Sequence, residues 1–212
     1  MFRMIKIIFN AFIIVLALIG FNAIGGQKYV EMAKEGIGNF IAEHNMQNAK
    51  KIGDFSKLNE EFQIDNTMSI AGYKAVIAEH KASGQKMVIL DSGKKALLTK
   101  EDIRSNNVDK KLKDLSEKFK YQGARVQDIK VTSRGTIQMY GQTVPYAKFE
   151  AHVTKLPFSD LGGIIASVQT SDGSEKLALS LSEKKKYSQL IASEFYRGVN
   201  EGVKEGVNKR GK

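Results

Sequence analysis

The side chains best suited to metal binding or proton transfer in this chain are its three histidines, His44, His80 and His152. A zinc site needs several ligands that converge at short helical spacing or on paired strands. No His-x-x-x-His or comparable pair occurs in the sequence, and cysteine is absent, which also excludes disulfides and a thiol nucleophile. The sequence therefore predicts no metal site, and it predicts that His152 is an ordinary surface residue on the polar face of a strand.

Two further kinds of motif could carry chemistry, a serine nucleophile and a phosphate-binding loop. No Gly-x-Ser-x-Gly elbow is present, and the serines fall mostly in turn sequences. Gly162-Gly163 precedes an apolar strand and lacks both the Gly-x-Gly-x-x-Gly spacing and the lysine of a phosphate loop, so we expect a loop there. A Ser-His-Asp arrangement draws on distant parts of a chain and is not excluded by sequence. We predict no catalytic residue and no cofactor, and an enzyme is the third of three functional interpretations.

The formal net charge is +10, which favours encounters with anionic lipid, nucleic acid or acidic polymers. Lys184-Lys185-Lys186 opens a predicted last helix, where each cation opposes the helix dipole at a cost of roughly a few tenths of a kcal/mol. That cost could mark a contact with anionic lipid or polymer, although we favour a solvated helix face. Nucleic-acid binding needs basic residues interleaved with exposed aromatic side chains. Most aromatic residues here fall at inward-facing positions, so we predict no nucleic-acid partner.

The N-terminal segment has the layout of an export signal. Arg3 and Lys6 precede an apolar stretch at residues 7–24, and Ala23 and Gly25 are the small residues that a signal peptidase requires. The stretch is also just long enough, as a helix, to cross a hydrocarbon core of about 30 Å. Both positive charges lie before it, so the N-terminus stays in the cytoplasm and the rest is exported. Cleaved signal peptide and membrane anchor both remain open.

Beyond that segment, the hydrophobic pattern changes between helical and strand periods. Helices are predicted at residues 28–51, 54–62 and 108–121, and after Ser182. A period of two predicts strands at residues 70–81, 86–91, 96–98, 125–133, 136–140, 143–154, 164–170 and 176–181. Turns are expected at 65–66, 134–135, 141–142 and 171–174, and a loop at 157–163.

Local signals refine these elements. Thr99 and Asp102 have capping-box spacing, and Ser182 is the predicted cap of the last helix, in which Leu190 and Phe195 face inward. The strand at 143–154 alternates cleanly, with one face apolar and the other polar. The apolar face carries Ala147, Phe149, Ala151 and Val153, and the polar face carries Lys148, Glu150 and His152.

The predicted fold class is α+β, a mainly antiparallel sheet packed against helices and preceded by an N-terminal membrane-targeting helix. The domain organisation follows from the shifts in pattern. We predict a signal peptide or membrane anchor at 1–25, a helical linker at 26–53, an α+β globular domain at 54–197 and a flexible basic tail at 198–212.

Part of this order of elements resembles the PsbP-like family. The resemblance rests on residues 143–153, on residues 162–170 with the hairpin into 177–181, and on a terminal helix containing Tyr187 and Phe195. It covers roughly residues 55–200 as an order of elements. It implies a binding or accessory domain, often exported, without conserved chemistry. The metal-binding positions of photosynthetic members match no residues here.

The leading interpretation is an exported, non-enzymatic envelope accessory or binding protein of unknown ligand. It would lie in the cell envelope, at the outer face of the cytoplasmic membrane or beyond it, with that membrane as its first partner. Another envelope protein or an anionic surface is a further candidate partner. The alternative is a pilin-like structural assembly subunit, since an apolar helix continuing into an amphipathic one before a sheet has that architecture. The expected Gly, aromatic and Glu pattern after the apolar segment is missing.

Overall fold

The computed structural model describes residues 46–70, 73–94, 96–118, 126–154 and 160–202. The targeting helix predicted within residues 1–25 lies outside them. So does most of the helix predicted at 28–51, of which residues 46–50 are helical. Within the described ranges, no helix combines the length and apolar character needed to span a membrane.

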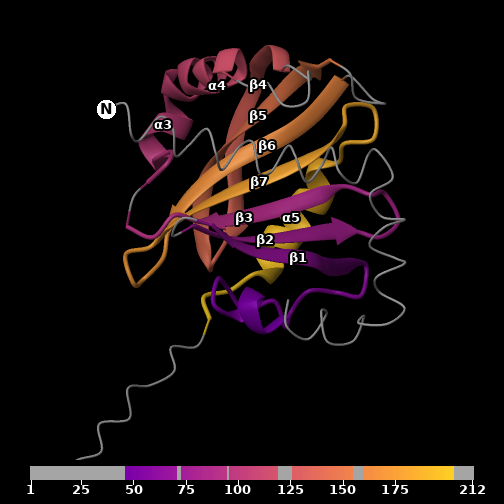
Figure 1. Ribbon diagram of the computed structural model, residues 1–212, viewed down its shortest axis with the longest axis vertical. Coiled ribbons are helices and arrows are strands. Elements are labelled where there is room, and N and C mark those ends of the chain that lie inside the picture. The colour runs from indigo at the N-terminus through magenta and orange to yellow at the C-terminus, as the bar shows by residue number, and fades with distance from the viewer. Residues whose placement is uncertain (1–45, 71–72, 95, 119–125, 155–159, 203–212) are drawn as a thin grey trace, which may run out of the picture.

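A seven-stranded sheet in the order β1-β2-β3-β7-β6-β5-β4 forms the centre of the molecule, and every neighbouring pair is antiparallel (Figure 1). Two meanders, β1 to β3 and β4 to β7, meet where β3 pairs with β7. The α+β class with a mainly antiparallel sheet is therefore confirmed. The strands are β1 (Phe62–Ile70), β2 (Tyr73–His80), β3 (Lys86–Asp91), β4 (Val126–Met139), β5 (Gln142–Val153), β6 (Asp160–Gln169) and β7 (Glu175–Glu183).

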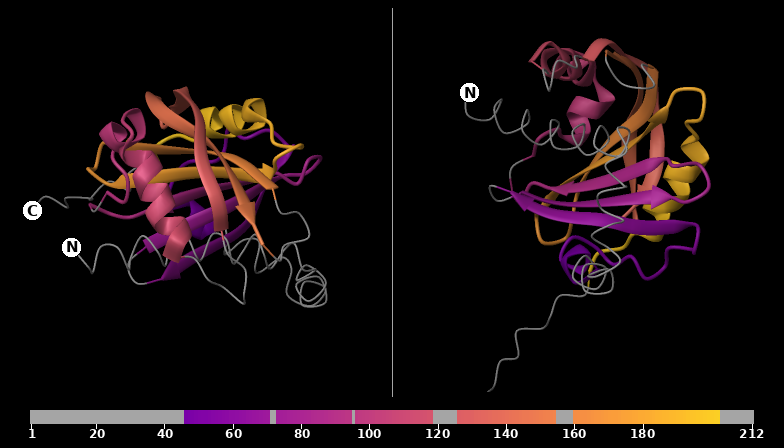
Figure 2. Two further views of the ribbon diagram at one scale, coloured as in Figure 1. Left: turned by 90° about the horizontal axis from the view of Figure 1, so that it is seen from above. Right: turned by 45° about the vertical axis from the view of Figure 1, so that its right-hand side comes forward.

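Helices cover both faces of this sheet, with α3 (Lys100–Arg104) and α4 (Asn107–Lys118) on one face and α5 (Gln189–Gly198) on the other (Figure 2). Each face therefore has its own apolar cluster. The α5 side includes Val76, Met87, Ile89, Ile164, Phe195 and Tyr196. The α3–α4 side includes Val88, Ile103, Val108, Leu112, Phe149 and Leu179.

The alternation predicted for residues 143–154 is confirmed in β5. Ala147, Phe149, Ala151 and Val153 are all buried, and Lys148, Glu150 and His152 are partly exposed. The helix predicted at 108–121 is also confirmed, as α4. Val108 and Leu112 of its apolar stripe are buried, whereas the side chains of Leu115 and Phe119 lie outside the described residues. The capping box of Thr99 and Asp102 is present at the start of α3.

The loop expected at Gly162-Gly163 is wrong, because both glycines lie inside β6. Gly163 is required there by close packing and not by an unusual backbone angle. A Cβ atom added at Gly163 would lie 2.4 Å from the carbonyl oxygen of Ser180 on β7.

The turn predicted at Arg134-Gly135 is also wrong, since β4 runs through it as one strand with two bulges. Gly135 lies beside the phenol of Tyr146, whose oxygen would be 2.7 Å from an added Cβ atom. Here again the glycine makes room for a side chain. The hairpin that was predicted next does form, with positive φ at Tyr140 and Gly141.

The early part of the domain departs most from prediction. Residues 54–61 form turns instead of a helix, and β1 begins at Phe62. Asp65 and Asn66 lie in that strand, where a bulge turns Asp65 toward Lys86 of β3 with Nζ to Oδ2 at 2.6 Å. The strand predicted at 96–98 is absent from those described residues, whose Leu97 and Leu98 are buried before α3.

The last helix begins later than predicted, because its cap is Ser188 and not Ser182. Lys184-Lys185-Lys186 therefore forms an exposed turn ahead of the helix. Phe195 is fully buried as predicted, but Leu190 is 76% exposed.

The folded domain also extends past both predicted boundaries. Ala49 and Ile52, placed in the linker, are buried in the core. Val199 is buried as well, and Asn200 pairs with Asp54 in an isolated antiparallel bridge. Residues 198–202 are thus part of the fold, and the remainder of the predicted tail lies outside the described residues.

Replacing Gly163 by Ala should lower the free energy of unfolding by about 1–3 kcal/mol or more, because the methyl group overlaps the backbone of β7. Gly162→Ala is the matched control, since its closest contact would be 3.2 Å, to Cβ of Tyr187. Chemical denaturation of both variants measures the difference. Equal losses would contradict the close approach of β6 and β7 at Gly163.

Candidate functional site

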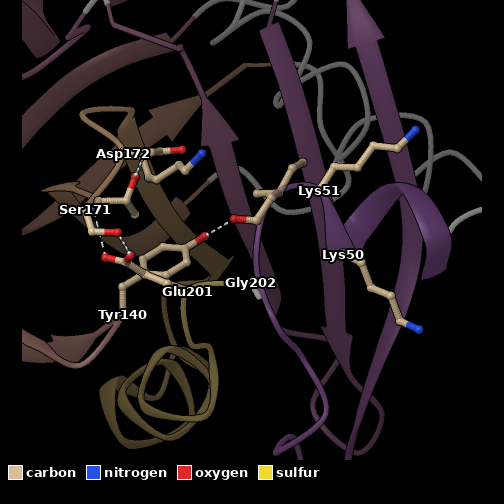
Figure 3. Close-up of a pocket in the computed structure, with 10 residues that line it drawn as sticks. Lys50, Lys51, Tyr140, Ser171, Asp172, Glu201 and Gly202 are labelled. Carbon is tan, nitrogen blue, oxygen red and sulfur yellow. Dashed lines mark hydrogen bonds between the residues drawn. The ribbon is translucent and has the colours of Figure 1, made fainter. Parts of the chain in front are cut away.

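A polar pocket of about 220 Å³ lies at one end of the sheet, where four segments far apart in the sequence meet. They are the end of the first described helix, the β4–β5 turn, the β6–β7 hairpin and the residues that follow α5 (Figure 3). The lining residues are Lys50, Lys51, Ile52, Tyr140, Thr170, Ser171, Asp172, Lys176, Glu201 and Gly202.

Tyr140 is buried and joins three of these segments. Its hydroxyl donates a hydrogen bond to the carbonyl oxygen of Ile52 at 2.8 Å, and its backbone N–H donates to Val199 at 3.1 Å. Burial raises the pKa of the Tyr140 phenol well above its usual value. The Tyr140 phenol therefore stays neutral, and its proton is used in the hydrogen bond to the carbonyl oxygen of Ile52.

The β6–β7 hairpin supplies a carboxylate that is already held in place. One oxygen of Asp172 accepts from the backbone N–H of Ser174 at 2.9 Å and from the hydroxyl of Thr170 at 2.8 Å. These hydrogen bonds, the Ser174 backbone first, lower the pKa of Asp172 to about 2. The side chain is exposed, so an ionised carboxylate faces solvent at the mouth of the pocket.

The chain after α5 closes the adjacent wall. Glu201 accepts from the backbone N–H of Ser171 at 2.9 Å and also from the Ser171 hydroxyl. Gly202 passes the first described helix so closely that an added Cβ atom would be 3.0 Å from the carbonyl oxygen of Lys50. The residues that follow α5 are therefore part of the pocket.

A buried ion pair supports the pocket from the sheet. Nζ of Lys176 lies 2.7 Å from Oδ2 of Asp91, and both residues are almost inaccessible to solvent. The other oxygen of Asp91 accepts from the backbone N–H of Gly93 at 2.8 Å. Removing one partner of such a pair leaves an uncompensated buried charge, which is strongly destabilising. The Lys176 ammonium group is therefore part of a structural ion pair.

The charges of the pocket are divided between its two sides. Figure 3 shows Ser171, Asp172 and Glu201 together on one side, and Lys50 and Lys51 on the other with side chains that extend away from them. Both lysines are exposed, and Lys51 Nζ donates to Asn48 Oδ1 at 3.1 Å. A ligand here would therefore meet carboxylates and hydroxyls on one side, while the ammonium groups of Lys50 and Lys51 point away from it.

This arrangement suits binding better than proton transfer. The hydroxyls of Tyr140 and Ser171 are engaged as hydrogen-bond donors, and the Lys176 ammonium is paired. The Asp172 carboxylate is too weak a base to take a proton near neutral pH. Fixed polar groups are what a recognition site requires.

Of the three histidines considered in the sequence, His44 lies outside the described residues, and neither of the other two lines this pocket. His80 is buried beside Ser83, with Nδ1 2.9 Å from its hydroxyl oxygen. His152 lies at the other end of β5, 2.9 Å from Asp160. Among the residues that the structure describes, no three His, Cys, Asp or Glu side chains form a group that could hold a metal ion.

The pocket itself was missed by sequence reasoning. Its local signals are two predicted turns that do form, the Ser171 to Ser174 turn and the β4–β5 hairpin at Tyr140 and Gly141. The other walls are formed by residues 50–52 and 201–202, whose meeting in three dimensions no spacing in the sequence encodes.

Comparison with known proteins adds no relative. A scan against models of protein families finds no match for this chain, and neither does a search of curated proteins. The resemblance to PsbP-like domains therefore stays a prediction.

Proposed function

We propose that this chain is an exported, non-enzymatic accessory protein of the cell envelope, whose polar pocket binds a ligand or a segment of another envelope protein. It works at the outer face of the cytoplasmic membrane, held there by residues 1–25 or released after their cleavage. Export is supported by the charge asymmetry of Arg3 and Lys6 around the apolar stretch.

The observation that carries the binding role is the pre-organised state of the pocket. Its carboxylates are fixed by Thr170, Ser171 and Ser174, so little side-chain freedom is lost when a ligand enters. The same engagement leaves these groups poorly suited to act as an acid, a base or a nucleophile. Recognition without chemistry is the function that this geometry supports best.

Export is tested with a reporter fused after Lys212 that is active only outside the cytoplasm. The fusion should be active, and mass spectrometry of the N-terminus should find Gly26 if residues 1–25 are cleaved or Met1 if they are retained. A fusion that is active only with a cytoplasmic reporter would overturn the proposal. Polymers in cross-linked membranes would favour the pilin-like subunit instead, since an accessory module should remain unpolymerised.

The binding role is tested by placing a photo-cross-linking phenylalanine derivative at Lys51, which is exposed and lines the pocket. Irradiation of intact cells should give an adduct of defined mass. The matched control carries the same group at Lys110, an exposed residue of α4 that does not line the pocket. The same adducts from both positions, or none from either, would contradict a binding site in the pocket.

A further inference from the structure

Five lysines gather at the end of the sheet opposite the pocket, and none of them lines the pocket. Lys130 comes from β4, Lys148 from β5, and the other three from the turn between β7 and α5. We call this group the lysine cluster, which consists of Lys130, Lys148, Lys184, Lys185 and Lys186.

The cluster is organised around one carboxylate, that of Glu150 on β5. Nζ of Lys184 lies 2.8 Å from Oε2 of Glu150, and Nζ of Lys130 lies 3.8 Å from the same atom. Lys148 extends over the ring of Tyr187, 5.8 Å from its centroid. Lys184, with the charges of Lys130 and Lys148, lowers the pKa of the Glu150 carboxyl. Two strands, β4 and β5, and the turn after β7 thus converge on one positively charged face.

The cluster carries more positive charge than its own acids neutralise. The neighbouring carboxylates are Glu150, Glu183, which pairs with Lys186, and Asp160, which pairs with His152. Five ammonium groups against three carboxylates leave an excess of two positive charges.

These lysines contribute little to holding the fold. The side chains of Lys130, Lys184 and Lys186 are 68%, 48% and 67% exposed. Exposed ion pairs are worth only about 0–1 kcal/mol each, so they open at little cost. Their ammonium groups are therefore available to the closely spaced charges of an anionic polymer.

The lysine cluster lies at the end of the sheet opposite the two ends of the described chain. The described chain begins and ends at the pocket, since Gly202 passes Lys50 and Asn200 pairs with Asp54. β7 leads from Lys176 in the pocket toward Lys184 in the cluster, and β5 leads from Gln142 toward Glu150. At about 3.3 Å per residue, either path separates the two sites by roughly 26 Å. The proposed anchor at residues 1–25 would therefore precede the part of the described chain that lies at the pocket end, opposite the lysine cluster.

We propose that the lysine cluster binds an anionic polymer of the envelope, on the side of the domain that faces away from the cytoplasmic membrane. Its orientation rests on the proposed export and attachment. The binding itself depends only on the described surface and would be found in vitro even if the export proposal failed.

The test uses the full chain in phosphatidylcholine nanodiscs with long-chain inorganic polyphosphate as the probe. Lys184→Gln/Lys185→Gln should weaken binding by about tenfold or more and reduce the slope of log Kd against log salt by about two, one for each charge removed. Lys94→Gln/Lys110→Gln is the matched control, with the same loss of charge at exposed lysines away from the cluster. Its Kd should change by less than about threefold.

Equal weakening by the two pairs would mean that net charge alone attracts the probe, and it would overturn the proposal. So would unchanged binding by the cluster variant.

A membrane partner is tested by exchanging half of the phosphatidylcholine for phosphatidylglycerol. Protection of Lys184 and Lys185 from amine labelling by that exchange would assign the cluster to lipid instead of polymer. Labelling that does not change is the expected result. Thermal unfolding of each variant checks that the fold survives.

Discussion

The arrangement of this protein depends on how α5 is fixed to the sheet, and that attachment begins with the side chain of Gln85. This side chain is fully buried, and its amide group makes three hydrogen bonds of 2.9 Å. It donates to the hydroxyl of Ser180 on β7 and to the carbonyl of Ser188, and it accepts from the backbone N–H of Ser188. Both backbone groups at the cap of α5 are thus satisfied inside the core, where an unpaired polar group costs about 1–3 kcal/mol. Phe195 and Tyr196 then pack the helix into the apolar cluster on the α5 side of the sheet.

The pocket and the lysine cluster, the two proposed binding surfaces, both depend on this placement of α5. The turn before α5 brings Lys184 to Glu150, and the chain after α5 brings Glu201 to Ser171. The helix is α5 (Gln189–Gly198), so its two ends deliver residues to opposite ends of the sheet. The pocket and the lysine cluster are consequently separated by the length of the strands, so the two proposed binding roles involve opposite ends of one domain.

The sequence predicted what local periodicity determines and failed where contacts are distant. The alternation of β5 and the capping box at Thr99 depend on neighbours in the chain, and both were correct. Gly135 and Gly163 were taken for turn and loop residues, because a glycine that admits Tyr146 or the β7 backbone leaves the same local signal as a glycine in a turn. The start of α5 was misplaced for a similar reason. Ser182 is paired with Gly162 inside β7, whereas the backbone of Ser188 is bound by Gln85, and both contacts are distant in the sequence. The sequence indicated only part of one candidate site, Lys184-Lys185-Lys186 as a possible contact with an anionic partner. Lys130 and Lys148, and the walls of the pocket, were missed because they join the sites from distant segments of the chain.

The measurement that tests this account most directly is hydrogen exchange of Gln85→Met, which keeps an unbranched side chain but removes the amide. Ser188 and Ser180 lose their partners, so stability should fall by at least about 2 kcal/mol. Protection of backbone amides should decrease both at residues 184–190 and at residues 199–202, while Gln138→Met on the exposed side of β4 leaves both unchanged. Loss of protection confined to residues 180–190, with the C-terminal end intact, would contradict the claim that one attachment of α5 positions both surfaces.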